Sequence, residues 1–268
     1  MGDVISPSAV LPIAGLLALL PTAGLAAMMH LARRPAPSGT WRDRLNALAA
    51  ASPWSGRDAG LLLLGLATAQ LLRALLPASP ALDVLALHGV LAAGLLLLAR
   101  NKTRPFGLPL PVRAVLGPAV LRWLAVLPLL WAAALAWHFV LQAAGHAPAL
   151  QQAVQLFLET ADPWQRAGLV LLAVVIAPVV EEMVFRGLLL PLLVRAAGPA
   201  GGLAVTAAGF AALHGDLTAA PALAILSAAL SLAYARTRSL RVPIAMHMLF
   251  NAANLALLLV LVRAGVDL

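Results

Sequence analysis

Two adjacent carboxylates, Glu181 and Glu182, interrupt a stretch that is otherwise typical of a membrane-spanning helix. The run 169–180 before them has no charged residue, and three leucines follow at 188–190. A charged residue such as Asp at the centre of a spanning helix costs roughly 2.5–3.5 kcal/mol on insertion scales. Two neighbouring carboxylates must therefore face protein or water rather than lipid, and they are candidates for chemistry.

One cation is placed to neutralise one of the two carboxylates. Arg186 follows Glu182 by four residues, which is the favourable order for an ion pair on a helix. Glu181 lies about 100° around the helix from Glu182, because each residue of an α-helix turns the chain by that angle. We expect Arg186 to hold Glu182, which leaves Glu181 free to face a cavity.

Two further pairs of side chains share helical faces downstream of the glutamates. Phe210 and His214 are four residues apart, and so are His247 and Asn251. A carboxylate with an imidazole can hold and deprotonate a water molecule. A second imidazole with a carboxamide can donate hydrogen bonds to the oxyanion of a tetrahedral intermediate. These residue types, supplied by three separate helices, suit hydrolysis.

A metal centre is the alternative use of the same side chains. Glu181, His214 and His247 have the donor atoms of a zinc site that keeps its fourth position for water. The chain has no cysteine, which excludes disulfides and thiolate ligands. The HExxH spacing of many zinc proteases is also absent.

The three motifs, EEMVFR at 181–186, FAALH at 210–214 and HMLFN at 247–251, resemble the CPBP family of intramembrane proteases in type and order. That family includes CAAX prenyl endopeptidases and bacteriocin-processing or self-immunity proteins. The resemblance covers roughly residues 165–255 and implies an intramembrane endopeptidase, for which the metal-free route is preferred over zinc. It implies that Glu181 is the general base assisted by His214, that Arg186 holds Glu182, and that His247 and Asn251 form the oxyanion hole.

The elements that must position these residues are membrane helices. The chain is 62% hydrophobic and only 10% charged, against about 25% charged residues in ordinary soluble domains. We therefore predict an all-α, polytopic membrane protein. Runs near the length of ~20 apolar residues that a bilayer requires predict about eight transmembrane helices, at 9–31, 60–77, 81–99, 118–143, 165–185, 202–214, 219–235 and 243–263.

The basic residues alternate between the predicted loops. The loops after the first, third, fifth and seventh spans contain most of the Lys and Arg, and cytoplasmic loops collect such residues. This alternation predicts an integral protein with both termini outside. The Ala- and Arg-rich composition indicates a bacterial inner membrane. The net charge of +8 is therefore a topology signal, and we expect no nucleic-acid partner. The expected partners are membrane lipid and a membrane-associated protein or peptide substrate.

The chemistry is expected in the C-terminal part of one integrated membrane domain. Residues 1–150 contain spans without an assignable motif, and residues 151–268 contain the catalytic core. His30, His88, His138 and His146 match no motif. Two alternative functions stay open: a catalytically idle family member that acts as an immunity or binding protein, and a proton-coupled transporter that uses the two glutamates. Transporters usually contain internal repeats, and none is visible in the sequence.

Overall fold

The computed structural model describes residues 7–33, 39–75, 80–146 and 152–264, and these residues form helices and turns without a strand. The predicted all-α class is confirmed. The predicted boundary between residues 150 and 151 lies outside the described residues. In chain order the elements are α1 (Pro7–Arg33), α2 (Trp41–Ala51), α3 (Gly56–Arg73), α4 (Pro80–Ala99), α5 (Val112–Ala143), α6 (Gln152–Glu159), α7 (Pro163–Leu171), the π-helical η1 (Leu172–Ile176), α8 (Ala177–Glu182), the π-helical η2 (Met183–Leu189), α9 (Leu190–Leu213), α10 (Ala220–Thr237) and α11 (Arg241–Arg263).

Four helical stretches among the described residues are long and apolar enough to cross a membrane: Val112–Ala143, Pro163–Leu213, Ala220–Thr237 and Arg241–Arg263. The chain is therefore an integral membrane protein. Helices also occupy the predicted spans 9–31, 60–77 and 81–99, although α3 already ends at Arg73 and residues 76–77 lie outside the described residues. That these helices cross the membrane, and the total of about eight, remain predictions.

The stretch from α7 to α9 forms two helical arms that reverse at Gly198, which corrects two predicted boundaries. We predicted that one span ends at 185 and the next begins at 202, but the first arm extends to residue 197 and the second begins at Pro199. The reversal occurs at Gly198, whose φ of 72° and ψ of 172° lie in a region that glycine alone adopts readily. Pro199 follows and begins the second arm, as proline often does at the first position of a helix.

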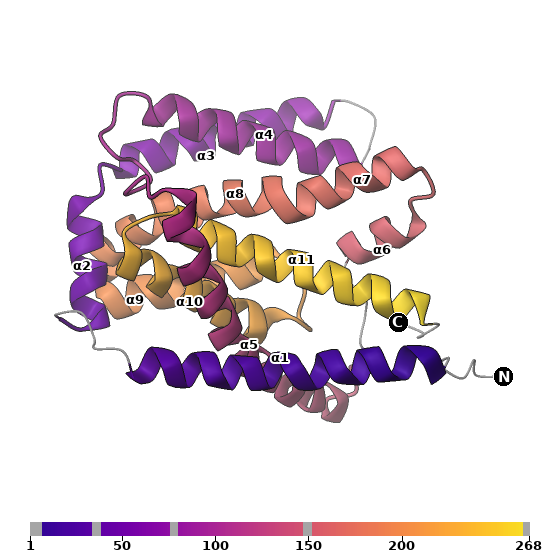
Figure 1. Cartoon of the computed structure of the whole chain (residues 1–268). Coiled ribbons are helices and arrows are strands. Elements are labelled where there is room, and N and C mark those ends of the chain that lie inside the picture. Colours follow the sequence, from indigo (N-terminus) through magenta and orange to yellow (C-terminus); the bar gives the residue numbers. More distant parts are fainter. Residues whose placement is uncertain (1–6, 34–38, 76–79, 147–151, 265–268) are drawn as a thin grey trace.

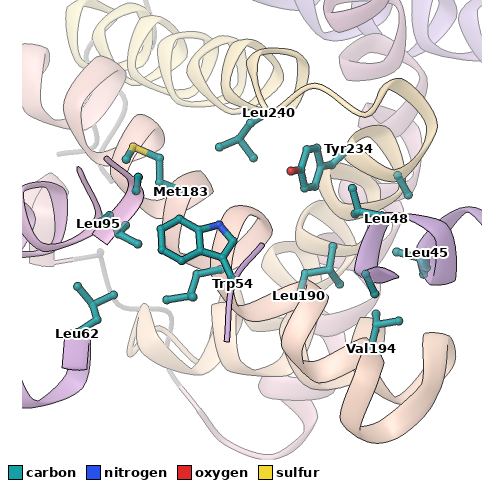
Figure 2. Close-up of a cluster of buried hydrophobic side chains, with 14 residues drawn as sticks. Leu45, Leu48, Trp54, Leu62, Leu95, Met183, Leu190, Val194, Tyr234 and Leu240 are labelled. Carbon is teal, nitrogen blue, oxygen red and sulfur yellow. The ribbon is translucent and has the colours of Figure 1, made fainter. Parts of the chain in front are cut away.

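The two arms of this hairpin pack against α2 and α10, as Figure 1 shows. A buried apolar cluster around Trp54 joins α2 to the first arm and to the end of α10 (Figure 2). Arg195, near the hinge, donates hydrogen bonds to the carbonyls of Ala49 and Trp54, which fastens the hairpin to the C-terminal end of α2 and the residues that follow it. The hairpin is thus held firmly at its closed end.

Helices α3 and α4 form a second hairpin, clamped by an ion pair at each end. Arg73 contacts Asp83 at 2.7 Å, and Lys102 contacts Asp58 at 3.0 Å. Burial by itself raises the pKa of Asp58. The hydrogen bonds from Ser55 and the ion pair with Lys102 lower it by more, so the pKa of this carboxyl is below its usual value. Helix α4 also packs against α8 and η2, which places an apolar helix of the N-terminal half beside the two glutamates.

The ends of the molecule differ in charge. The start of α1 and the end of α11 lie at one end of the molecule, while α2 and the turn between α10 and α11 lie at the other (Figure 1). The turn contains Arg238, and its backbone pairs with the α4–α5 loop through a bridge between Gly107 and Ser239. Placement of the start of α1 and the end of α11 at the same end agrees with the predicted topology, whose orientation remains a prediction.

Candidate functional site

Glu182 is the fully buried centre of an ion-pair network. Its Oε1 accepts hydrogen bonds from Nη1 of Arg186 at 2.8 Å and from Nδ1 of His247 at 3.0 Å. Both Glu182 and Arg186 are 0% exposed. Nη2 of Arg186 also donates to the carbonyl and the hydroxyl of Ser227 on α10. The predicted helical ion pair therefore forms, and it reaches two further helices.

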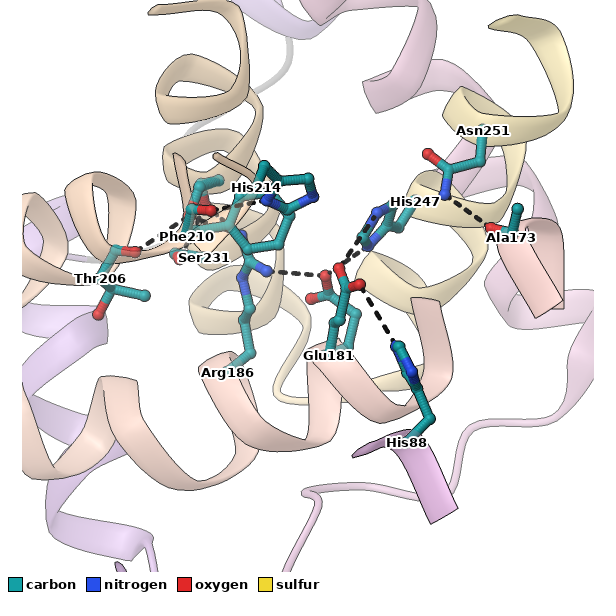
Figure 3. A network of polar contacts seen from close by, with 12 residues as sticks. His88, Ala173, Glu181, Arg186, Thr206, Phe210, His214, Ser231, His247 and Asn251 are labelled. Carbon is teal, nitrogen blue, oxygen red and sulfur yellow. Dashed lines mark hydrogen bonds and ion pairs between the residues drawn. The ribbon is translucent and has the colours of Figure 1, made fainter. Parts of the chain in front are cut away.

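His247 has a defined ring orientation because of this network. Its Nδ1 is the atom that contacts Glu182, so Nδ1 bears the hydrogen and Nε2 points elsewhere. That Nε2 lies 3.9 Å from Oε2 of Glu181. The ring thus contacts Glu182 through Nδ1 and faces Glu181 through Nε2. Figure 3 shows His247 beside Glu181.

Phe210 is the apolar wall shared by the polar side chains. Its ring is fully buried and lies 4.6 Å from the ring of His214 and 5.7 Å from that of His247, between centroids. The Arg186 guanidinium lies over the same ring at 4.7 Å. Cations bind favourably over aromatic faces, more so when water is excluded. The phenylalanine of the FAALH motif therefore supports a buried cation and two histidines at once.

His214 comes to the site from the end of the second hairpin arm. Glu181 and His214 lie at nearly equal chain distances from the hinge at Gly198, so antiparallel arms bring them to similar depth. Nδ1 of His214 contacts the carbonyl of Phe210 at 2.7 Å. A carbonyl only accepts, so Nδ1 donates and Nε2 is left open. The residue is exposed, and its side chain interacts electrostatically with Glu181.

Glu181 differs from its neighbour in its surroundings. Its side chain is 25% exposed, and Oε2 is buried without a hydrogen bond among the described residues. The carboxylate faces imidazoles from three other helices: His247, His214 and His88. Glu182 is therefore held by two direct contacts, whereas Glu181 is partly exposed and meets its neighbours at longer distances.

Asn251 lies one turn beyond His247, as its spacing predicted, but it has a backbone partner. Its Nδ2 donates to the carbonyl of Ala173 at 2.8 Å. In η1 the N–H of Ala177 binds the carbonyl of Leu172, the i+5 pattern of a π-helix. The matching partner of Ala173 would be Pro178, which has no N–H. Asn251 therefore satisfies a carbonyl that the proline leaves free, and one amide hydrogen remains for another acceptor.

His88 was not among the predicted site residues, yet it lies in the site. Its Nε2 is 3.8 Å from Oε1 of Glu181, as Figure 3 shows. The signal in the sequence was an imidazole inside an otherwise apolar run, but no motif connected the predicted span 81–99 to the others. Only the packing of α4 against α8 brings the two residues together.

The candidate metal donors are Glu181, His214 and His247. Among the described residues no group of three His, Cys, Asp or Glu side chains is arranged to hold a metal ion. Oε2 of Glu181 and Nε2 of His247 lie 3.9 Å apart, while Nδ1 of His247 contacts Glu182.

A comparison with protein families places this site in a known context. Residues 163–253 match the family model of the Rce1-like, type II CAAX prenyl endopeptidases. The matched segment contains Glu181, Glu182, Arg186, His214, His247 and Asn251, whereas His88 lies outside it. No curated protein and no solved structure matches the chain. The resemblance to the CPBP proteases is thus confirmed, and over residues 163–253 the chain is similar to the Rce1-like type II CAAX prenyl endopeptidases.

Proposed function

We propose that this protein is an intramembrane endopeptidase in which Glu181 activates water to cleave peptide bonds of membrane-associated substrates. One observation carries the proposal: Glu181 has a buried Oε2 without a hydrogen bond among the described residues, within a ring of imidazoles. The family match supports peptide hydrolysis as the reaction class. Membrane lipid surrounds the protein, and the substrate reaches the site from the membrane.

Glu181 is the general base of the proposed reaction, assisted by the open Nε2 of His214. As the water oxygen bonds to the peptide carbonyl carbon, a water proton moves to Glu181, and the carbonyl electrons move onto the oxygen. The proton then passes to the leaving nitrogen as the C–N bond breaks. The products are a carboxylic acid and an amine, and Glu181 is ionised again. General base catalysis of this kind contributes about 10²–10⁴-fold in rate.

The oxyanion receives hydrogen bonds from His247 and Asn251 in this proposal. When ionised, Glu181, Glu182 and Arg186 together carry one excess negative charge, and burial of unbalanced charge is unfavourable. Protons on the imidazoles that face Glu181 and Glu182 offset this charge. One of them is on Nε2 of His247, since Nδ1 already donates to Glu182. This Nε2–H and the second amide hydrogen of Asn251 are the donors.

The experiment that tests the function compares membrane proteomes. Cells that produce the wild type and cells that produce the Glu181→Gln variant are analysed by labelling of new protein N-termini. We expect a set of termini that the wild type generates and the variant does not. Glu159→Gln, at the end of α6, is the matched control and should behave as wild type. Identical termini in all three samples would exclude the protease and favour the idle or transport alternatives.

The choice between a metal-free reaction and zinc is tested on the purified protein. We expect activity on an identified cleavage site to survive exhaustive chelation, with metal content far below one ion per chain. Zinc present at one per chain, whose removal and return track activity, would overturn the metal-free route while leaving the hydrolase intact.

A further inference from the structure

His88 enters the site from the N-terminal half of the chain, on helix α4. Its side chain is 10% exposed, and its Nε2 lies 3.8 Å from Oε1 of Glu181. His247 lies on the other side of the same carboxylate, with its Nε2 3.9 Å from Oε2. Each oxygen of Glu181 is thus faced by one imidazole nitrogen.

The orientation of the His88 ring is set by its own helix. Nδ1 lies 2.8 Å from the carbonyl of Val84, one turn earlier. Because a carbonyl only accepts, Nδ1 bears a hydrogen, and Nε2 is directed away from this contact. On a neutral ring that Nε2 would present a lone pair to a carboxylate. The pair is therefore favourable when one proton lies between Nε2 and Glu181.

Packing alone does not account for an imidazole at this position. Helix α4 is apolar from Val84 to Ala99 apart from His88, and a polar side chain in such a helix is unfavourable without a partner. An apolar side chain could fill the same space between α4 and α8. The ion pairs of Asp83 with Arg73 and of Lys102 with Asp58, near the two ends of α4, hold this helix against α3, and α4 packs against α8 beside Glu181.

We propose that His88 is a positioning residue for Glu181: it holds Oε1 and keeps the carboxylate ionised, so that Oε2 remains directed at the reacting water. This inference rests on the proposed function. The other groups that face Glu181 are His247 on α11 and His214 at the end of α9, with Glu182 and Arg186 on its own helix. Of these residues that face Glu181, His88 comes from a helix outside the family-matched segment 163–253.

A chemical probe tests this assignment without a substrate. N,N′-dicyclohexylcarbodiimide modifies carboxyl groups in apolar surroundings only when they are protonated. Wild type, His88→Leu and His88→Gln, purified in nanodiscs, are labelled between pH 5 and 8, and peptide mapping quantifies modification of Glu181. We expect the labelling of Glu181 in His88→Leu to extend to higher pH by about one unit, because the carboxylate has lost a partner that favours its ionised form. His88→Gln, which can still donate to Oε1, should lie between the two.

Activity provides the second measurement, on a quenched peptide that spans a cleavage site found in the membrane proteomes. We expect His88→Leu to lower kcat about 10–100-fold, because misplacement of a reactive group by about 1 Å can cost ~10²-fold, with KM within threefold and partial rescue in His88→Gln. His138→Leu on α5, another histidine within a span, is the matched control and should keep wild-type kcat. An unchanged labelling profile and unchanged kcat in His88→Leu would refute the inference. Loss of cleavage in His88→Leu and His88→Gln alike, with unchanged labelling, would also refute it.

The two measurements separate this inference from the proposed function. If Glu181→Gln cleaves the peptide like wild type, the proposed function fails, whatever His88 does. If Glu181→Gln is inactive and His88→Leu is fully active with wild-type labelling, only the assignment of His88 fails.

Discussion

Two neighbouring glutamates have different environments because adjacent residues on a helix point about 100° apart. Glu182 is fully buried and accepts hydrogen bonds from both Arg186 and His247 on one oxygen. Glu181 is a quarter exposed and meets imidazoles at longer distances. One carboxylate therefore anchors the network, and its neighbour is left available for proton transfer.

The anchor role predicts that Glu182→Gln is mainly a stability mutation. Removing one partner of a buried ion pair leaves the other uncompensated, at a cost of roughly 3–5 kcal/mol. We expect a loss of this size in unfolding measurements in detergent, whereas Glu181→Gln should stay within ~1 kcal/mol of wild type. A double-mutant cycle of Glu182→Gln with Arg186→Met should give a coupling energy well above zero, and additive effects would contradict the network.

Asn251→Ala should lower kcat while KM changes little. Donors directed at the tetrahedral oxygen act mainly in the transition state, so loss of one lowers kcat about 10²–10³-fold with a modest change in KM. Because Asn251 also binds the carbonyl of Ala173, the variant loses roughly 1 kcal/mol of stability as well. Steady-state kinetics on the identified peptide provide the measurement.

Pro178→Ala is the matched background for this variant, because alanine supplies an N–H that can bind the carbonyl of Ala173. In that background the stability effect of Asn251→Ala should shrink while the kinetic effect persists. If the kinetic effect disappears together with the stability effect, Asn251 has a structural role only.

The hairpin formed by α7 to α9 is the element that assembles the site. Its first arm contains the glutamates and its second arm ends at His214, and the reversal at Gly198 sets which residues of the arms lie opposite each other. The π-helical segments η1 and η2 flank α8 on the first arm. π-Bulges are frequent at functional sites, since they expose backbone groups that other side chains must satisfy.

Gly198→Ala should destabilise the protein through backbone strain alone. A Cβ at this position would meet no atom within 4 Å, but the positive φ of 72° is unfavourable for alanine. We expect a loss of about 1–3 kcal/mol in detergent unfolding. Gly209→Ala on the second arm is the control. A Cβ at Gly209 would also meet no atom within 4 Å, and Gly209 has no positive φ. Alanine there should stabilise the protein by ~0.5–1 kcal/mol. Equal effects of the two substitutions would argue against the hinge.

At the scale of the whole molecule, the arrangement of helices separates a basic end from the end at which α1 begins and α11 ends. Arg104, Arg195 and Arg238 lie in or beside turns at the basic end. The positive-inside tendency predicts that this end faces the cytoplasm. The candidate site side chains lie on helices between the two ends, as the proposed function requires of a site that takes substrates from the membrane.

The absence of cysteine allows a direct test of this orientation. Thr103→Cys is placed in the exposed loop after α4, and Ala161→Cys in the exposed turn before α7. In intact cells freed of their outer membrane, a membrane-impermeant maleimide should label Ala161→Cys, while Thr103→Cys should react only after the membrane is opened. The reverse pattern would show that the termini face the cytoplasm.

The sequence by itself determined the features that depend on one helical turn. Composition was sufficient for the all-helical membrane class, because length and hydropathy are properties of the chain alone. The ion pair of Glu182 with Arg186 and the shared faces of Phe210 with His214 and of His247 with Asn251 follow from the geometry of a single helix. These local relations, in their order along the chain, were also enough to indicate the family.

Tertiary structure decided every relation between helices. Helices that are apolar on all sides have no periodic pattern to show which face meets a neighbour. For this reason the sequence could not predict that His88 contacts Glu181 or that His247 contacts Glu182. Nor could it predict that Asn251 donates a hydrogen bond to the carbonyl of Ala173. The continuation of the first arm past Arg186 was missed for another reason: the reversal at Gly198 is recognised only when its backbone conformation is known. Rotation and register of packed helices depend on close side-chain fit across the interface, and this fit exists only in the folded chain.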